Sequence, residues 1–380
     1  MIKPYKLAFI GGGINSVVGS VHFSASRMDN KFVPVSGCFS RNAEINRQTA
    51  ERWGIEDNRL YSDWVSLLDN EINSVDAVVI LTPTPTHAEI TLEALKRGYA
   101  VICEKSIAMN VQEAMPIATH LKKNDGFLSV VYNYTGYPIV KEMKHIISSN
   151  KLGKINQIHI EMPQDIYTRL NTNKIQSWRN IDGIMPTISL DLGIHLHHMV
   201  SYLVDQNATS VIGEEFTNGN NPNITDNVIC IAKYANQLRC QMWFGKTAAG
   251  IRNGLKIRVF GEIGSMEWLQ TNPEELVLNY SKGERMILDR ANTEVHICSD
   301  TRYNRFKAGH PIGFLEAFSN WYSDVHNELE NYKNGIKQPD DYVYGINRAI
   351  NGLKFFESVT ESSKKRCWIN IPEQGKFNER

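Results

Sequence analysis

A short strand that runs directly into three consecutive glycines is the feature that most constrains the fold of this chain. KLAFI leads into Gly11, Gly12 and Gly13, and a helical pattern follows from about Asn15. Glycines at this point let the backbone approach a pyrophosphate, which then rests on the amides of the helix N-terminus. The segment therefore predicts the first strand–helix turn of a nucleotide-binding domain, with a purely structural tight turn as the alternative.

The segments after this loop alternate between strand and helix patterns at short intervals. FVPVSGCF, VDAVVIL, YAVICEK and FLSVVYN have the composition of buried strands. Two of the intervening helices have capping-box spacing at their start, Thr86 with Glu89 and Asn110 with Glu113. We expect six strand–helix units that end near residue 135. This order predicts an α/β fold whose residues 1–135 form a Rossmann dinucleotide-binding domain.

The second half of the chain has a different pattern, in which strands follow one another without intervening helices. INQIHIEMP, ATSVIGEEFT, NVICIAKYA, LRCQMWFG, LKIRVFGEIGSMEWLQ and ELVLNYS predict a large, open, mainly antiparallel sheet. We assign 136–380 to a second, α+β domain for substrate binding and oligomerisation, and expect its C-terminal helices to pack on the first domain or on the sheet. A sheet face without helices is usually buried against a partner, so we expect a homodimer or homotetramer.

Composition and charge narrow the possible partners. Lys plus Arg and Asp plus Glu number 41 each, without long runs of either sign, so the chain lacks the basic surface typical of nucleic-acid or anionic-membrane binding. The N-terminal segment is too short and polar for a secretory signal, and no run of 18 apolar residues occurs. The six cysteines form no C-x-x-C pair. We expect a cytoplasmic protein with buried, reduced thiols and a small-molecule partner.

The residues after the second predicted strand bear on the choice of nicotinamide cofactor. An acidic residue there would accept a hydrogen bond from the ribose 2′-hydroxyl of NAD. This chain has Phe39, Ser40 and Arg41 instead. A hydroxyl and a guanidinium suit a 2′-phosphate, so NADP is favoured over NAD. The alternative for Arg41 is a solvated residue in the first turn of a helix.

Further polar residues lie at the ends of predicted strands or beside the Asp191 segment. Lys105, in CEKS, lies at the strand edge where ligands bind in open α/β sheets, and can stabilise a developing alkoxide. By itself it could equally be a surface lysine. Asn133 and Tyr134 are candidates for contact with the nicotinamide end. Trp178 and Arg179 offer a ring for a sugar face and a guanidinium for hydroxyl groups; a packed tryptophan with a surface arginine is the alternative.

The segment DLGIHLHHMV contains an aspartate and three histidines. On an α-helix, Asp191, His195 and His198 fall within about 60° of one another, whereas His197 points elsewhere. Such a face can bind a metal, transfer a proton, or consist of hydrogen-bonded structural residues. The three candidate ligands span roughly 10 Å along the axis, too far to share one ion. We therefore expect no metal and favour acid–base chemistry.

The order of these motifs resembles that of the glucose–fructose oxidoreductase and inositol dehydrogenase family, over nearly the whole chain. The glycine loop, TPTPTH, EKS and DLGIH are similar to the family motifs G-x-G-x-x-G, T-P-N-x-x-H, E-K-P and D-x-G-x-H. The departures are Ser16 for the third glycine, Thr84 for the asparagine and Ser106 for the proline. None of them removes a group that handles protons, although losing the proline affects how Lys105 is aimed.

The resemblance implies that Lys105, Asp191 and His195 form the catalytic group of an NAD(P)-dependent oxidoreductase. Its substrate would be a sugar, inositol or sugar derivative, oxidised or reduced at one secondary hydroxyl. His195 would be the base, since its pKa lies near the operating pH. Asp191 would orient the imidazole or hold a neighbouring hydroxyl, and Lys105 would stabilise the alkoxide.

The residues and the resemblance together give two predicted sets. The predicted cofactor-binding residues are Gly11, Gly13, Ile14, Asn15, Ser40, Arg41, Thr82, Pro83, Thr84, His87, Glu104, Lys105 and Asn133. The predicted substrate-binding residues are Lys105, Tyr134, Trp178, Arg179, Asp191, His195 and His198. Two other functions stay open: a redox-neutral isomerase or glycosidase that retains its cofactor, and a ligand sensor without catalysis. The complete catalytic group argues against the sensor.

Overall fold

The chain forms two compact units. The computed structural model describes residues 3–168, 177–336 and 342–373. The first unit contains the described residues of Met1–Asn133 and Phe314–Ile350, and the second those of Tyr134–Gly313 and Asn351–Gly375. The first unit is therefore built from two separate stretches of sequence.

The first unit is organised around a parallel sheet with the strand order β2-β1-β3-β4-β5. Its strands are β1 (Tyr5–Gly11), β2 (Phe32–Cys38), β3 (Ala77–Leu81), β4 (Val101–Cys103) and β5 (Leu128–Val130). The expectation of six strand–helix units is wrong: the described part of this unit has a five-stranded sheet. After β5 the chain forms a 3-10 turn, Asn133–Gly136, rather than another strand.

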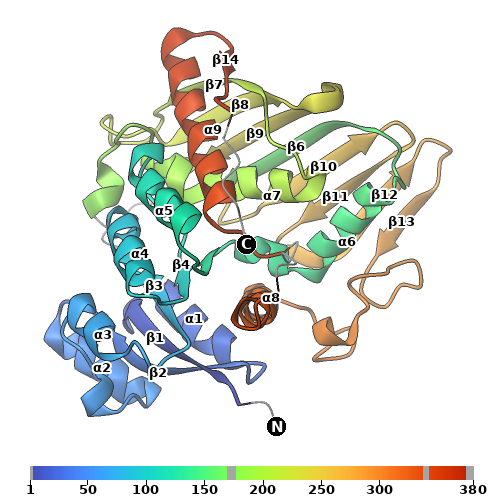
Figure 1. The fold of residues 1–380 in the computed structure, drawn as a ribbon. Helices are drawn as coiled ribbons and strands as arrows, with labels where there is room; N and C mark the ends of the chain where they lie inside the picture. The colour runs from blue at the N-terminus through green and yellow to red at the C-terminus, as the bar shows by residue number, and fades with distance from the viewer. Residues whose placement is uncertain (1–2, 169–176, 337–341, 374–380) are drawn as a thin grey trace. The chain divides into compact units, whose positions relative to one another are not determined.

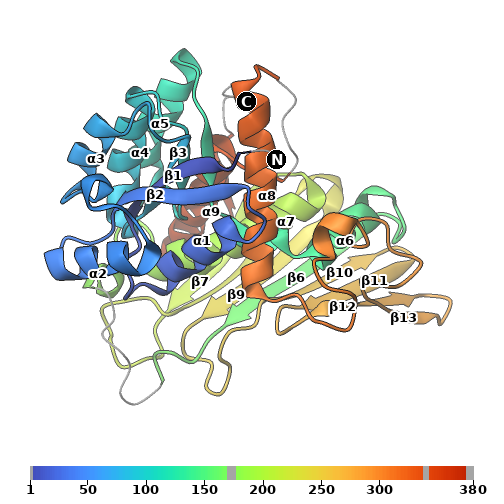
Figure 2. The ribbon, with the colours of Figure 1, turned by 90° about the horizontal axis from the view of Figure 1, so that it is seen from below.

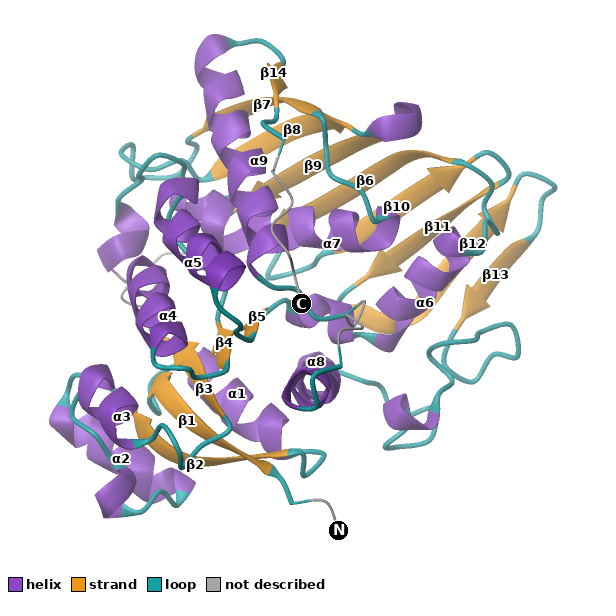
Figure 3. Ribbon diagram, viewed as in Figure 1, coloured by secondary structure: helices purple, strands orange, loops and turns teal. Residues whose placement is uncertain are grey.

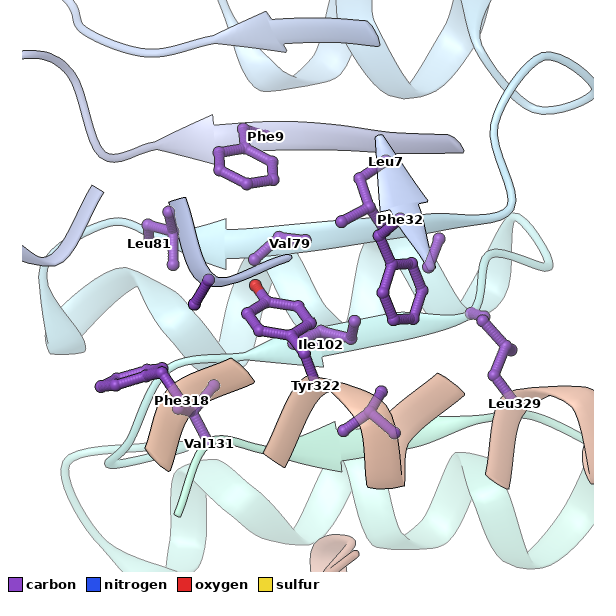
Figure 4. Close-up of a cluster of buried hydrophobic side chains, with 14 of the residues drawn as sticks. Leu7, Phe9, Phe32, Val79, Leu81, Ile102, Val131, Phe318, Tyr322 and Leu329 are labelled. Carbon is purple, nitrogen blue, oxygen red and sulfur yellow. The ribbon is translucent and has the colours of Figure 1, made fainter. Parts of the chain in front are cut away.

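Helices lie on both faces of this sheet. They are α1 (Val17–Arg27), α2 (Ala43–Trp53), α3 (Trp64–Asn70), α4 (His87–Lys96), α5 (Val111–Lys123) and α8 (Phe314–Lys333). Helices α1 and α8 lie on one face and α3, α4 and α5 on the other (Figure 1, Figure 2). Phe318 and Tyr322 of α8 belong to the same buried cluster as Leu7, Phe9 and Val79 of the strands (Figure 4). A helix far along the sequence thus completes the core of the first unit.

The two predicted capping boxes have different outcomes. At α5 the prediction is confirmed, because the Asn110 side chain accepts a hydrogen bond from the Glu113 amide at 2.9 Å. At α4 the predicted position is confirmed, because Thr86 is the N-cap residue, but the predicted capping hydrogen bond is wrong, because the Thr86 side chain does not bond a helix amide. The Thr86 hydroxyl instead donates to the Thr82 hydroxyl at 2.8 Å. The hydroxyl is therefore used within the strand-end loop rather than on the helix amides.

The second unit contains a nine-stranded sheet in the order β13-β12-β11-β10-β6-β9-β8-β7-β14. Strands β6 and β9 pair in parallel, and the other neighbours pair antiparallel, as expected of a mainly antiparallel sheet. The strands are β6 (Ile155–Pro163), β7 (Ser210–Phe216), β8 (Asn227–Lys233), β9 (Arg239–Gly245), β10 (Lys256–Gly261), β11 (Gly264–Leu269), β12 (Asn272–Tyr280), β13 (Arg285–Leu288) and β14 (Ile369–Asn370). The last two were not predicted; both are too short to show a pattern.

Helices lie along one face of this sheet (Figure 3). They are α6 (Pro138–Ser148), α7 (Ile194–Val204) and the part of α9 (Ile346–Lys365) from residue 351 onward. Strand β8 shows the consequence, because Val228 and Cys230 are buried whereas Ile229 and Ile231, which alternate with them, are 41% and 42% exposed. The sheet therefore has one core face and one face with exposed apolar side chains.

Two expectations from composition can be compared with the structure. All six cysteines are free thiols and five are buried, but Cys367 is exposed, so the prediction of buried thiols is wrong at this position. Cys367 comes just after α9 ends, outside the strands that carry Cys38, Cys103, Cys230 and Cys240. No helix in the described part of the chain is long and apolar enough to cross a membrane.

The raised pKa of one carboxyl group in the second unit predicts that the stability of the protein depends on pH. Glu215 of β7 accepts a hydrogen bond from the Thr360 hydroxyl at 2.6 Å, and burial raises its pKa to about 7. The folded protein then binds a proton that the unfolded chain releases above about pH 4.5. Stability should therefore fall as the pH rises from about 4.5 to 7.

Glu215→Gln should remove this loss, giving a protein about 1–3 kcal/mol more stable than wild type at pH 8 and similar to it at pH 5. Urea unfolding at both pH values measures the difference. Glu214→Gln, at the exposed neighbouring position, is the control. An equal pH dependence in wild type and Glu215→Gln would contradict the prediction.

Candidate active site

The glycine loop of the first unit lies against the end of β3. Gly11 and Gly12 have positive φ angles of 85° and 76°, which favour glycine. A Cβ on Gly11 would lie 2.8 Å from the Thr82 nitrogen, and one on Gly12 would lie 2.6 Å from Cδ1 of Leu81. The loop is thus a close-packed backbone surface at the carboxyl edge of the sheet.

The start of α1 shows how the chain compensates for Ser16, which stands where the family motif has its third glycine. The Ser16 side chain caps the helix by accepting a hydrogen bond from the Gly19 amide at 3.3 Å. The closest contact between helix and loop is made by Gly19, where a Cβ would lie 1.7 Å from the Gly12 oxygen. Close packing therefore depends on a glycine three positions further along the chain.

The turn after β2 is held by a residue that the sequence did not suggest. Asn46 Oδ1 accepts hydrogen bonds from the amides of Phe39 at 2.7 Å and Ser40 at 3.3 Å. The Ser40 hydroxyl accepts one from the Asn42 amide at 3.1 Å. Arg41 is exposed. The described residues of this turn thus present a fixed backbone, a hydroxyl and an exposed guanidinium.

His87 links the two strand-end motifs. Its Nδ1 lies 2.7 Å from the Ser106 carbonyl oxygen and its Nε2 lies 2.6 Å from that of Thr82. The ring is buried, and burial lowers its pKa. The Lys105–Ser106 peptide bond, where the family motif has a proline, is cis. These contacts give His87 a role in positioning both loops.

Glu104 belongs to a buried series of hydrogen-bonded side chains. One carboxylate oxygen lies 2.9 Å from His22 Nε2, and the other accepts the Lys105 amide at 3.0 Å. The other ring nitrogen of His22 lies 2.6 Å from the Tyr322 hydroxyl. This series of hydrogen bonds holds the backbone at Lys105 in place. His22 and Tyr322 were missed because they lie on α1 and α8, far from Glu104 in sequence.

The residues at this edge are suited to a dinucleotide. The loop leaves no room for side chains at Gly11 and Gly12, as a surface for a closely approaching pyrophosphate requires. Asn133 adds a polar group, since its Nδ2 is buried without a hydrogen-bond partner in the described part of the chain. The predicted cofactor-binding residue Ile14 differs from Asn133, because its backbone amide already donates a hydrogen bond to Thr49 Oγ1 at 3.1 Å.

In the second unit, Asp191 lies in a π-helical turn, Ser189–Gly193, directly before α7. The sequence predicted one continuous α-helix from Asp191 to His198, and this is wrong. A π turn widens the helix and changes the direction in which residues on its two sides point. The α-helical spacing from Asp191 therefore does not hold across this turn, whereas His195 and His198 both lie in α7.

Asp191 forms ion pairs with two cations. Its Oδ2 contacts Arg179 and lies 2.6 Å from the ammonium nitrogen of Lys246. The Arg179 guanidinium lies over the ring of Trp178, 4.7 Å from its centroid. The structure thus brings together three of the predicted substrate-binding residues, and adds Lys246. No motif marks Lys246, which simply follows the strand QMWFG.

The three histidines of α7 have different surroundings. His195 packs edge-on against Tyr134, with ring centroids 4.7 Å apart. His197 packs against Phe355 at 5.0 Å. His198 lies beside Tyr202, whose ring is 4.6 Å from the Lys144 ammonium nitrogen. Among the residues that the structure describes, no group of three or more His, Cys, Asp or Glu side chains is arranged to hold a metal ion.

Comparisons with known proteins agree with the fold of both units. Residues 5–132 match the model of an oxidoreductase family with an NAD-binding Rossmann fold, and residues 140–267 match the GFO/IDH/MocA C-terminal domain. These matches define the class of the protein as an oxidoreductase with an NAD-binding Rossmann fold. The chain belongs to the GFO/IDH/MocA family of oxidoreductases.

Individual relatives are similar over nearly their full length. An uncharacterised oxidoreductase of Bacillus subtilis is 27% identical, with 97% of each chain covered. Levoglucosan dehydrogenase of Pseudarthrobacter phenanthrenivorans is 24% identical, with 98% of this chain and 99% of that protein covered. An inositol dehydrogenase homologue of Azotobacter vinelandii, solved with NADH and myo-inositol, has a TM-score of 0.90 at 24% identity, with 97% and 98% coverage.

Proposed function

We propose that this protein is an NAD(P)-dependent dehydrogenase that acts on one secondary hydroxyl of a sugar, inositol or related cyclic polyol. The observation that carries the proposal is that models of one oxidoreductase family match both units, in a chain that retains Lys105, Asp191 and His195. Relatives named as levoglucosan and myo-inositol 2-dehydrogenases support the substrate class. We retain the division of 1–135 for the dinucleotide and 136–380 for the substrate and oligomerisation.

The proposed chemistry assigns one task to each catalytic residue. When bound, the nicotinamide supplies or accepts the hydride. Loss of hydride from a secondary alcohol also requires loss of the hydroxyl proton, which His195 accepts. The Lys105 ammonium stabilises the negative charge that develops on this oxygen. Asp191 accepts a hydrogen bond from a neighbouring substrate hydroxyl. The Lys105 backbone is held by its hydrogen bond to Glu104. The Asp191 carboxylate is held by Arg179 and Lys246.

The remaining predicted residues have supporting roles in this proposal. The glycine loop, the turn after β2, the two strand-end motifs and Asn133 bind the dinucleotide. The substrate is contacted by Tyr134, Trp178, Arg179 and His198. A redox-neutral reaction with retained cofactor is the second candidate function, since the same hydride and proton steps run forward and back.

The test is an absorbance assay at the reduced nicotinamide band, with NAD or NADP and a panel of myo-inositol, levoglucosan, glucose and glucose 6-phosphate. Net formation of reduced cofactor with at least one sugar is expected. A product without net reduction would indicate the redox-neutral function. No reaction with any sugar would contradict the proposed substrate class.

We further propose that NADP is preferred over NAD. The turn after β2 has no carboxylate to repel a 2′-phosphate, and Arg41 is exposed beside it. Fluorescence titration should give tighter binding of NADPH than of NADH in the wild type. Arg41→Ala should lose this preference, and Ser40→Asp should reverse it, because a carboxylate repels the phosphate. At least tenfold tighter binding of NADH by the wild type would contradict the preference.

We also propose a homo-oligomer, a dimer or tetramer, formed through the sheet face that carries Ile229 and Ile231. Both side chains are more than 40% exposed although they lie in the middle of a strand. Light scattering at micromolar concentration should give a multiple of the 43.2 kDa chain mass. Ile231→Lys should shift the particle toward the monomer, and a monomeric wild type would contradict the proposal.

A further inference from the structure

Lys246 is a residue of the second unit that no sequence motif marks. Its side chain is 6% exposed, and its ammonium nitrogen lies 2.6 Å from Asp191 Oδ2. A nearly buried lysine requires a compensating partner, because removing an ammonium group from water is costly. Asp191 supplies that charge. Removal of Lys246 should therefore affect Asp191 before any other carboxylate.

The backbone around Lys246 is fixed on both sides. The Lys246 amide donates to the Asp226 carbonyl at 2.9 Å, and its carbonyl accepts the Tyr167 amide at 2.9 Å. The preceding residue, Gly245, is equally confined, since a Cβ there would lie 2.1 Å from Asn227 Oδ1. The Lys246 backbone, directly after β9, is thus held in place by hydrogen bonds to Asp226 and Tyr167.

Asp226, the closest buried acid in sequence, has its own partners. Its two carboxylate oxygens accept the amides of Asn218 at 3.0 Å and Gly219 at 2.7 Å, and Oδ1 also accepts Nδ2 of Asn227 at 2.8 Å. These donors stabilise the Asp226 charge without Lys246. The Lys246 ammonium is instead directed to Asp191, with the Tyr167 ring centroid 5.3 Å away.

The two cations on one carboxylate oxygen bear on whether Asp191 carries a proton or accepts a hydrogen bond. A carboxylate next to two positive charges strongly favours its charged form, so it is a poor proton carrier and a good hydrogen-bond acceptor. Asp191 is therefore suited to accept a hydrogen bond, which leaves proton transfer to His195 in the proposed mechanism.

We propose that Lys246 is a positioning residue that, together with Arg179, holds the Asp191 carboxylate charged and oriented to accept a hydrogen bond from a substrate hydroxyl. This inference rests on the proposed dehydrogenase function and adds a residue to it. It also makes a specific claim about kinetics: Lys246 affects substrate binding more than the hydride step.

The experiment compares Lys246→Met, Lys246→Arg and a matched control, Lys256→Met. Lys256 lies on β10 of the same sheet and forms a half-exposed ion pair with Glu267 at 3.0 Å. Steady-state kinetics with myo-inositol or levoglucosan, whichever the wild type oxidises, give KM and kcat separately. NADH affinity and the thermal melting temperature check that each variant is folded.

Lys246→Met should raise KM at least tenfold and lower kcat by a smaller factor, because the acceptor for a substrate hydroxyl loses its orientation. Lys246→Arg should stay within about threefold of wild-type KM, since a guanidinium restores the charge. A merely unfolded fraction would lower apparent kcat and leave KM unchanged. Such a pattern, or a KM for Lys246→Met within twofold of that of Lys256→Met, would overturn the proposal.

The proposal and the dehydrogenase function can fail separately. If the wild type oxidises a panel sugar and Lys246→Met matches it, only the role of Lys246 fails. If the wild type oxidises no panel sugar, the proposed function fails. Lys246 is then judged by calorimetric binding of myo-inositol and levoglucosan with NADH present. Binding that is lost in Lys246→Met supports its role, and equal or absent binding in both proteins overturns it.

Discussion

Lys105→Met and His195→Ala are each expected to lower kcat by about 10²- to 10⁴-fold while leaving the affinity for reduced cofactor nearly unchanged. Positioned acid–base groups typically contribute this much to a rate. Both residues are proposed to act on the reacting hydroxyl and not on the phosphates of the dinucleotide. Turnover on the sugar panel and fluorescence titration of the cofactor measure the two effects independently.

Each variant has a control in the same part of the chain. Lys96→Met removes an exposed lysine of α4 that pairs with Glu93, and should not change kcat. His197→Ala removes a buried ring that packs on Phe355, so it should lower the melting temperature but preserve kcat per folded molecule. A His195→Ala enzyme that keeps more than about a tenth of the wild-type rate would rule out His195 as the base.

Gly19→Ala is expected to weaken cofactor binding at least tenfold and to destabilise the protein by about 3 kcal/mol. The added Cβ would lie 1.7 Å from the Gly12 oxygen, so α1 and the glycine loop must move apart. Because the loop and the helix N-terminus form the proposed pyrophosphate site, this movement should affect binding and folding together. Fluorescence titration with NADH and NADPH and urea unfolding measure the two effects.

The control for this substitution is Gly183→Ala. A Cβ at Gly183 meets no heavy atom within 4 Å, and its φ lies outside the range that favours glycine. This variant should resemble wild type in both measurements. If Gly19→Ala retained cofactor affinity within twofold and wild-type stability, the contact between Gly12 and Gly19 would not be important for the loop.

Local patterns in the sequence predicted the parts of the fold that depend on neighbouring residues. Alternating buried strands and helices predicted the parallel sheet, and six strand segments after residue 155 predicted the antiparallel one. Asn110 and Glu113 predicted a cap that forms as expected. In each of these cases the signal and the structure lie within a few residues of one another.

Two of the predictions that failed are cases in which a nearby structure competes with the local pattern. Thr86 has the spacing of a capping box, but a 3-10 turn directs its hydroxyl to Thr82. Asp191 has the spacing of an α-helical face with His195, but a π turn intervenes. Neither turn has a sequence signal as strong as the motif that it overrides.

The sequence by itself determined the class of both sheets and the candidate motifs, from the glycine loop to DLGIH, because these depend on periodicity and short-range spacing. Only the tertiary structure decided which residues support the motifs. Tyr322 contacts His22, which lies 300 residues earlier in the chain, and His22 in turn contacts Glu104, 82 residues after it. Lys246 contacts Asp191 from the end of another element, 55 residues away. The physical reason is that a buried charge or imidazole takes its partner from whatever packs against it, and that neighbour is set by the fold rather than by sequence distance.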